Sequence, residues 1–154
     1  MNLELNVKNQ KETEFLAKKL AKNKFGNMIV CLDGDLGCGK TFFSKSFAKE
    51  IGVTEEITSP TFTIIKEYEA KIPFNHIDVY RLNGDIEGLG LDEYFDTNGI
   101  TFIEWASTIK EYLPKERLEI VISRTGDTSR KIVFKSYGNK YDELLEAIRW
   151  KYYF

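Results

Sequence analysis

The apolar positions of the chain follow two regular spacings. Residues 28–32 form an unbroken apolar run, which is typical of a strand covered on both faces. Further along, Phe43, Phe47 and Ile51 recur every four residues, and Gly52 follows them as a helix-ending residue. This part of the sequence therefore predicts a buried strand, a short loop and an amphipathic helix, in that order.

The loop of this unit has a sequence typical of phosphate binding. It fits the P-loop pattern G-x-x-x-x-G-K-[ST], as Gly34-Asp35-Leu36-Gly37-Cys38-Gly39-Lys40-Thr41. In such loops the glycines let successive N–H groups point at phosphate oxygens, and the helix begins beneath them. Lys40 reaches the β- and γ-phosphates, and the Thr41 hydroxyl is suited to ligate Mg²⁺. The order of strand, glycine loop and helix predicts a nucleotide site.

Other periodic segments surround this unit. A first strand is predicted at residues 3–7, and a helical stripe over residues 15–21 follows Asn9 and Glu12, which resemble a capping box. Further β-rich segments lie at residues 61–68, 74–80, 100–104, 118–123 and 132–136, and a last helix carries Leu144, Leu145 and Ile148. The sequence predicts an α/β fold, a P-loop NTPase-like three-layer arrangement with a central mixed, largely parallel sheet flanked by helices.

Composition narrows the class of protein. The chain has 154 residues, 42% of them hydrophobic and 30% charged, which indicates one globular domain over residues 1–154. A net charge of −2 provides no global basic field for nucleic acid. The two cysteines, Cys31 and Cys38, form neither a metal-binding pair nor a disulfide framework. Without an apolar run of membrane-spanning length or a signal peptide, we expect a cytoplasmic protein with no membrane partner.

Two acidic residues lie in predicted strands and are candidates for phosphoryl chemistry. Asp78 interrupts the apolar segment 74–80, and Glu104 ends the run 100–104. A carboxylate in an apolar strand is costly unless it is paired or faces a cation, and P-loop enzymes use such a group at Mg²⁺. Spacing slightly favours Glu104 as the magnesium ligand, with Asp78 free to orient water. His76, on the face of Asp78, is interpreted as a partly buried core histidine.

Three further features remain open on sequence alone. The segment Ser59-Pro60-Thr61-Phe62-Thr63 either begins a strand or forms a loop that senses the γ-phosphate. Trp105, directly after a strand, belongs either to the core or to the site. Thr13, in the first turn of a helix, is interpreted as a surface threonine.

A competing motif occurs near the end of the chain. Residues 139–142 read N-K-x-D, the guanine-reading element of GTPases. A D-x-x-G occurs at residues 85–88, which no apolar strand precedes, and Asn139 also suits a helix N-cap. A small GTP-binding protein is therefore the lesser alternative.

Five blocks together resemble one family. They occur in the order GDLGCGKT at 34–41, SPTFT at 59–63, HIDVYRL at 76–82, LGLDEYF at 89–95 and IEW at 103–105. With these blocks the chain resembles the TsaE (YjeE) family, the small ATPase of the bacterial machinery that makes threonylcarbamoyladenosine next to the tRNA anticodon. That family usually has alanine where this chain has Cys38, a change that a side chain facing away from phosphate tolerates.

The resemblance implies ATP or ADP and Mg²⁺ as cofactors. The phosphates would lie on the backbone of Leu36, Gly37, Cys38, Gly39, Lys40 and Thr41. Mg²⁺ would be held by Thr41 and Glu104, and Asp78 would be a catalytic acid near the γ-phosphate. Thr61 and Thr63 would belong to a switch segment, with Trp105 near the nucleotide and Thr13 on its adenine side.

The resemblance also implies partners. Members of the family act with TsaB and TsaD, so we expect slow ATP hydrolysis by the chain alone, and only indirect contact with tRNA. The alternative is a nucleotide-gated partner-binding switch in which hydrolysis is incidental.

Overall fold

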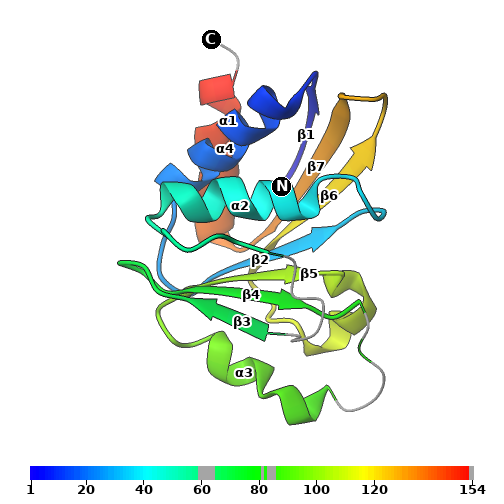
Figure 1. The fold of residues 1–154 in the computed structure, drawn as a ribbon. Helices are drawn as coiled ribbons and strands as arrows, with labels where there is room; N and C mark the ends of the chain where they lie inside the picture. The colour runs from blue at the N-terminus through cyan, green and yellow to red at the C-terminus, as the bar shows by residue number, and fades with distance from the viewer. Residues whose placement is uncertain (59–64, 81, 83–85, 153–154) are drawn as a thin grey trace.

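The apolar runs of the sequence assemble into one seven-stranded sheet in the computed structural model, which describes residues 1–58, 65–80, 82 and 86–152. The strand order is β1-β7-β6-β2-β5-β4-β3 (Figure 1). In chain order the elements are β1 (Asn2–Val7), α1 (Gln10–Lys22), β2 (Met28–Asp33), α2 (Lys40–Glu50), β3 (Ile65–Tyr68), β4 (Phe74–Asp78), η1 (Glu87–Leu89), α3 (Leu91–Tyr94), β5 (Ile100–Glu104), η2 (Ala106–Tyr112), β6 (Arg117–Arg124), β7 (Arg130–Tyr137) and α4 (Asn139–Tyr152).

The centre of the sheet is parallel and its edges are antiparallel. Strand β2 pairs in parallel with both β5 and β6, and β4 pairs in parallel with β5. Strands β1 and β7 on one side, and β3 on the other, add antiparallel pairs. The predicted α/β fold with a mixed sheet and a largely parallel centre is confirmed.

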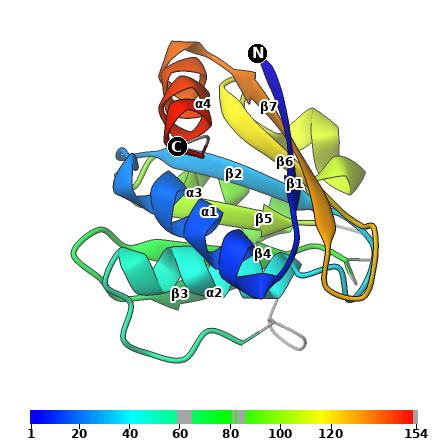
Figure 2. The ribbon, with the colours of Figure 1, turned by 90° about the horizontal axis from the view of Figure 1, so that it is seen from above.

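Helices cover the central strands on both faces. Helices α1, α2 and α4 lie on one side of the sheet, and α3 lies on the other (Figures 1 and 2). On the first side Phe47 of α2 packs on Phe74 and Phe102, with ring centroids 6.2 and 4.6 Å apart. The opposite face of the same strands packs with Leu91 and Ile109 in a second apolar cluster. This double burial explains the continuous apolar run of β2.

The predicted start of α1 is confirmed, and two other element boundaries differ from expectation. The Asn9 side chain caps α1 by accepting the Glu12 N–H at 3.0 Å, and the Glu12 carboxylate accepts the Lys8 N–H at 3.2 Å. Helix α4 differs from expectation, because Asn139 is its first residue and Gly138, at φ 113°, precedes it. The strand predicted over residues 74–80 was too long, since β4 ends at Asp78.

Among the residues described, no helix is both long and apolar enough to cross a bilayer.

Candidate nucleotide site

The candidate site lies where three neighbouring parallel strands end. Asp78 of β4 is in register with Glu104 of β5, and Glu104 is in register with Leu32 of β2. The P-loop follows β2 directly, so the fold brings both predicted carboxylates and the glycine loop to one edge of the sheet. Ligands of α/β proteins bind at this carboxyl edge.

The P-loop backbone adopts conformations that favour glycine. Gly34, Gly37 and Gly39 have φ values of 144°, 78° and 110°. A Cβ atom at Gly34 would lie 2.7 Å from the Cys38 sulfur, whereas one at Gly37 or Gly39 would meet no atom within 4 Å. Gly34 is therefore required for packing. The other two glycines border open space, where the backbone is accessible to a ligand.

The side chains of the P-loop point in different directions. Leu36 is exposed, whereas Cys38 is buried next to Gly34. Burial raises the pKa of the Cys38 thiol, although Lys40 partly opposes that shift. A buried and protonated thiol acts as a small apolar group, which agrees with the expectation that this position tolerates cysteine.

Lys40 is folded back within its own loop. Its ammonium group donates to the carbonyl oxygens of Gly34 at 2.5 Å and Asp35 at 3.0 Å, and only 5% of the residue is exposed. The same group lies 4.1 Å from the centre of the Trp105 ring, which stacks on Tyr80 at 4.6 Å. Trp105 thus lies against the P-loop lysine, which is held by neutral carbonyl oxygens and the face of this ring.

The backbone at Trp105 joins the site to the P-loop strand. Trp105 has φ 63°, which is uncommon for a bulky residue, and its N–H donates to the Leu32 carbonyl at 2.9 Å. Asp33 accepts from both the N–H and the hydroxyl of Ser107, at 3.2 and 2.7 Å. These bonds fix the segment after Glu104 against the start of the P-loop.

Glu104 is a buried carboxylate with an unexpected partner. Only 2% of Glu104 and none of His76 is exposed, and His76 Nε2 lies 2.5 Å from Glu104 Oε2. The sequence indicated His76 as a core residue. Its position two residues before Asp78 placed it on the same strand face, but the contact with Glu104 depends on the pairing of two strands.

Asp78 has an environment that favours its protonated form. Burial raises the pKa of its carboxyl group, and the negative charge of Glu104 raises it further. The Tyr80 N–H, which donates to Asp78 Oδ1 at 2.9 Å, acts in the opposite direction, as does the positive charge of Lys40. A carboxylate with a raised pKa is a better proton acceptor, as water activation requires.

A small cavity of about 120 Å³ adjoins the P-loop and contains Thr13. The surface interpretation of Thr13 was wrong, because packing of α1 beside α2 leaves it only 6% exposed. Sequence reasoning also missed Arg130, whose Nε donates to the Cys38 carbonyl at 2.9 Å. The cavity is lined by Gln10, Thr13, Cys38, Gly39, Phe42, Ile122, Asp127, Thr128 and Arg130.

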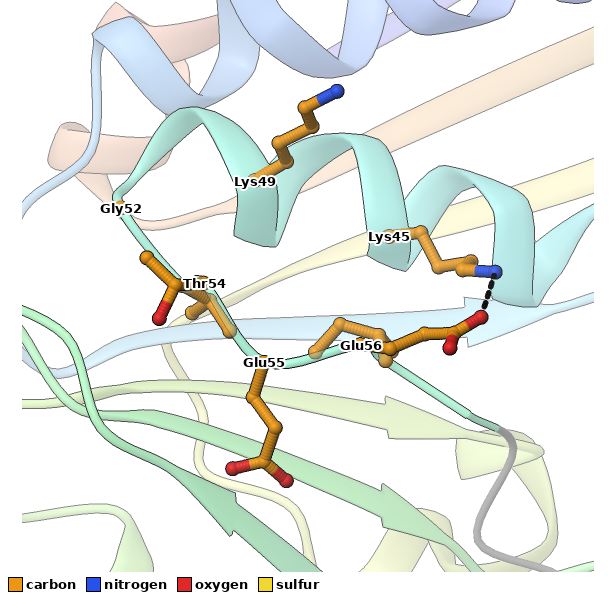
Figure 3. A pocket seen from close by; sticks show the side chains of 8 residues that line it. Lys45, Lys49, Gly52, Thr54, Glu55 and Glu56 are labelled. Atoms are coloured by element: carbon orange, nitrogen blue, oxygen red, sulfur yellow. Dashed lines mark ion pairs between the residues drawn. The ribbon is translucent and has the colours of Figure 1, made fainter.

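A larger hollow of about 480 Å³ lies near the other end of α2. Figure 3 shows Lys45 and Lys49 on the helix and Glu55 and Glu56 on the segment that follows it. Lys45 and Glu56 form an ion pair of 3.8 Å across it. None of the residues predicted to bind nucleotide lines this hollow.

Two further predictions concern the switch segment and the N-K-x-D element. Thr61 and Thr63 of the predicted switch segment lie outside the described residues. The N-K-x-D element lies at the opposite end of the sheet from the P-loop, since the Tyr141 hydroxyl accepts the N–H of Ile29 at the start of β2. Asp142 accepts from the Ser136 hydroxyl there. This geometry argues against guanine recognition by residues 139–142.

The donors present fit a magnesium ion only together with phosphate. No group of three or more His, Cys, Asp or Glu side chains that could hold a metal occurs in the described part of the chain. Thr41, in the first turn of α2, and Glu104 supply one hydroxyl and one carboxylate oxygen donor. Mg²⁺ prefers oxygen ligands and takes several from water and nucleotide phosphates, so this small donor set suits it.

Comparisons with known proteins agree with this arrangement. A family model described as "Threonylcarbamoyl adenosine biosynthesis protein TsaE" matches residues 7–132. The tRNA threonylcarbamoyladenosine biosynthesis protein TsaE of Bacillus subtilis (strain 168) is 49% identical over 141 residues, 91% of this chain and 89% of that protein. The protein of the same description from Rickettsia bellii is 37% identical over 134 residues, 84% of this chain and 92% of that protein. The crystal structure of Bacillus subtilis YdiB superposes with a TM-score of 0.85 at 43% identity, covering 98% of this chain and 96% of that one.

Proposed function

This chain belongs to the TsaE family, and we propose from that membership that it binds and hydrolyses ATP with Mg²⁺ to support the formation of threonylcarbamoyladenosine in tRNA. The relatives named for that biosynthesis support the pathway. One observation carries the chemical part of the proposal. The P-loop, with open space over Gly37 and Gly39, lies at the same sheet edge as Asp78 and Glu104.

The phosphates are proposed to bind the backbone from Leu36 to Thr41. The N-terminus of α2, which has no side-chain cap among the described residues, points its first N–H groups and the positive end of its dipole at this position. Lys40 would exchange the carbonyls of Gly34 and Asp35 for phosphate oxygens, which as anions are stronger acceptors. The adenine base is proposed to enter the small cavity that contains Thr13 and Arg130.

Thr41 and Glu104 are the residues proposed to hold the metal. When bound there, Mg²⁺ would neutralise charge on the β- and γ-phosphate oxygens. Asp78 is proposed to orient a water molecule and accept its proton as the oxygen of that water bonds to the γ-phosphorus. The bond between this phosphorus and the β–γ bridging oxygen breaks, which leaves ADP and inorganic phosphate.

The proposed partners are TsaB and TsaD, with tRNA contacted only through them. The net charge of −2 gives the chain no general affinity for a polyanion, which agrees with indirect contact. Hydrolysis is proposed to be slow for the chain alone and faster in the complex.

The test is ATP hydrolysis by the wild-type chain and by Glu104→Ala, each alone and with purified TsaB and TsaD. We expect stimulation of the wild type and loss of hydrolysis in the variant, with a cooperative thermal unfolding transition as the control for folding. Wild-type rates in Glu104→Ala would contradict the assignment of the metal site.

The second candidate function is a nucleotide-gated partner-binding switch. Trp105 favours considering it, because this residue contacts both Lys40 and Tyr80 and so links the nucleotide site to an exposed side chain. Full tRNA modification by a variant that binds ATP, binds TsaB and TsaD, and does not hydrolyse would favour the switch.

A further inference from the structure

We infer that His76 is a positioning residue, whose Nε2–H holds one carboxylate oxygen of Glu104 so that the other oxygen is presented to Mg²⁺. This inference rests on the proposed function, because it concerns the metal site that Thr41 and Glu104 form there. It assigns a role to a side chain that would otherwise be explained as a buried core residue.

The burial of Glu104 requires such a partner. An ionised carboxylate removed from water costs several kcal/mol unless it is hydrogen-bonded or paired. Glu104 is 2% exposed, and within the described residues His76 is its one hydrogen-bonding side chain. The contact at 2.5 Å therefore determines the orientation of the carboxylate.

The sheet register makes this contact specific. His76 is in register with Phe102, two residues before Glu104, so the imidazole reaches along the neighbouring strand rather than directly across. Both side chains lie on the face covered by α2, where Phe74 and Phe102 pack with Phe47. The imidazole borders this aromatic cluster, since the centroids of the Phe74 and His76 rings lie 6.2 Å apart.

The tautomer follows from the other ring nitrogen. His76 Nδ1 is buried and has no hydrogen-bond partner within the described part of the chain. An N–H at Nδ1 would be a buried donor without an acceptor, which is unfavourable. A hydrogen on Nε2 has an acceptor in Glu104 Oε2, so the geometry favours the Nε2–H tautomer.

The experiment compares three substitutions of His76. His76→Gln retains an amide N–H near the position of Nε2, His76→Met has similar size without a donor, and His76→Asn places its amide near Nδ1 instead. For each folded variant, the binding of a non-hydrolysable ATP analogue is measured by calorimetry without Mg²⁺ and over a range of Mg²⁺ concentrations.

We expect the magnesium dependence to separate the variants. Analogue binding without Mg²⁺ should match the wild type in all three. The apparent Mg²⁺ dissociation constant should rise about 10- to 100-fold in His76→Met and His76→Asn. It should stay near the wild-type value in His76→Gln. A residue that only fills the core would lower the unfolding midpoint without this pattern.

Three results would contradict either the role of His76 or the proposed metal site. Equal Mg²⁺ affinity of the wild type and the folded His76→Met or His76→Asn variant would overturn the role of His76. If His76→Met does not fold, the pair His76→Asn and His76→Gln decides, and equal affinities there have the same meaning. Binding of the analogue by the wild type without any effect of Mg²⁺ would instead overturn the proposed metal site.

Discussion

The two ends of helix α2 carry two hollows of opposite character. At the N-terminal end the chain buries Lys40 beside a glycine loop and two strand-end carboxylates, and the adjoining cavity has only about 120 Å³. Toward the C-terminal end the hollow has about 480 Å³ and is lined by exposed charges that pair across it. The charged residues of the larger hollow interact only weakly, because an exposed ion pair contributes about 0–1 kcal/mol.

The helix itself accounts for part of this difference. The N-terminus of α2 has unpaired N–H groups and a partial positive charge, which favour phosphate, whereas its C-terminus favours cations. Lys49 lies in the last turn, where a positive side chain complements the dipole without any ligand. In this protein a buried charged group and the polarity of the helix, rather than the volume of a hollow, indicate the candidate nucleotide site.

The difference between the two ends of α2 can be tested by removing one lysine from each end. Lys40→Ala should lower ATP hydrolysis by about 100- to 1,000-fold, since it removes a preorganised charge from the phosphates. Lys45→Ala, on the same helix, should leave hydrolysis unchanged because Lys45 is exposed and, within the described residues, forms its ion pair with Glu56. Steady-state phosphate release measures both. Equal losses in the two variants would refute the distinction between the ends.

A second test separates activity from stability at the N-terminal end. Asp78→Asn should lower hydrolysis by about 100-fold, because the amide cannot accept a proton from water. The pKa of Asp78 is raised by burial, so the folded state favours the protonated form and the ionised carboxylate is a cost at neutral pH.

It follows that Asp78→Asn should be at least as stable as the wild type at pH 7, as measured by urea unfolding. The advantage of the variant should shrink as the pH falls through the raised pKa of Asp78 in the folded state. It should vanish below the ordinary pKa of 3.8, where the folded and the unfolded wild type are both protonated. A variant that loses stability at pH 7 would show that the carboxylate is needed for folding rather than for chemistry.

The smallest effect is expected at the C-terminal end. Glu56→Gln breaks the ion pair with Lys45 while keeping the size of the side chain, and 80% of the Glu56 side chain is exposed. The free energy of unfolding should change by less than about 0.5 kcal/mol. Urea unfolding and phosphate release test this together, and a clear loss in either would mean that this hollow contributes to function.

Local patterns predicted the central unit of the fold well. The apolar run of β2, the glycine loop and the four-residue repeat of α2 are all encoded within neighbouring residues, so periodicity and turn chemistry suffice to find them. The acidic ends at Asp78 and Glu104 were also visible, because a charged residue in an apolar strand is conspicuous. Their adjacency in register follows only from the sheet.

Contacts between distant segments could not be predicted in the same way. The pair of His76 with Glu104 depends on the register of β4 and β5, which no single segment specifies. Thr13 is buried because α1 packs beside α2, and Arg130 reaches the Cys38 carbonyl across 92 residues of sequence. The N-K-x-D motif misleads for the same reason, since strand direction places it away from the P-loop.

The most direct test of the account uses the tryptophan that lies over Lys40. The chain has two tryptophans, so Trp150→Phe leaves Trp105 as the single indole fluorophore. Its emission is titrated with ADP, ATP, GDP and GTP, with and without Mg²⁺. We expect a saturable change of the Trp105 emission with adenine nucleotides, because phosphate binding draws the Lys40 ammonium away from the ring that it now contacts at 4.1 Å. No change with any nucleotide, or a stronger response to guanine nucleotides, would contradict it.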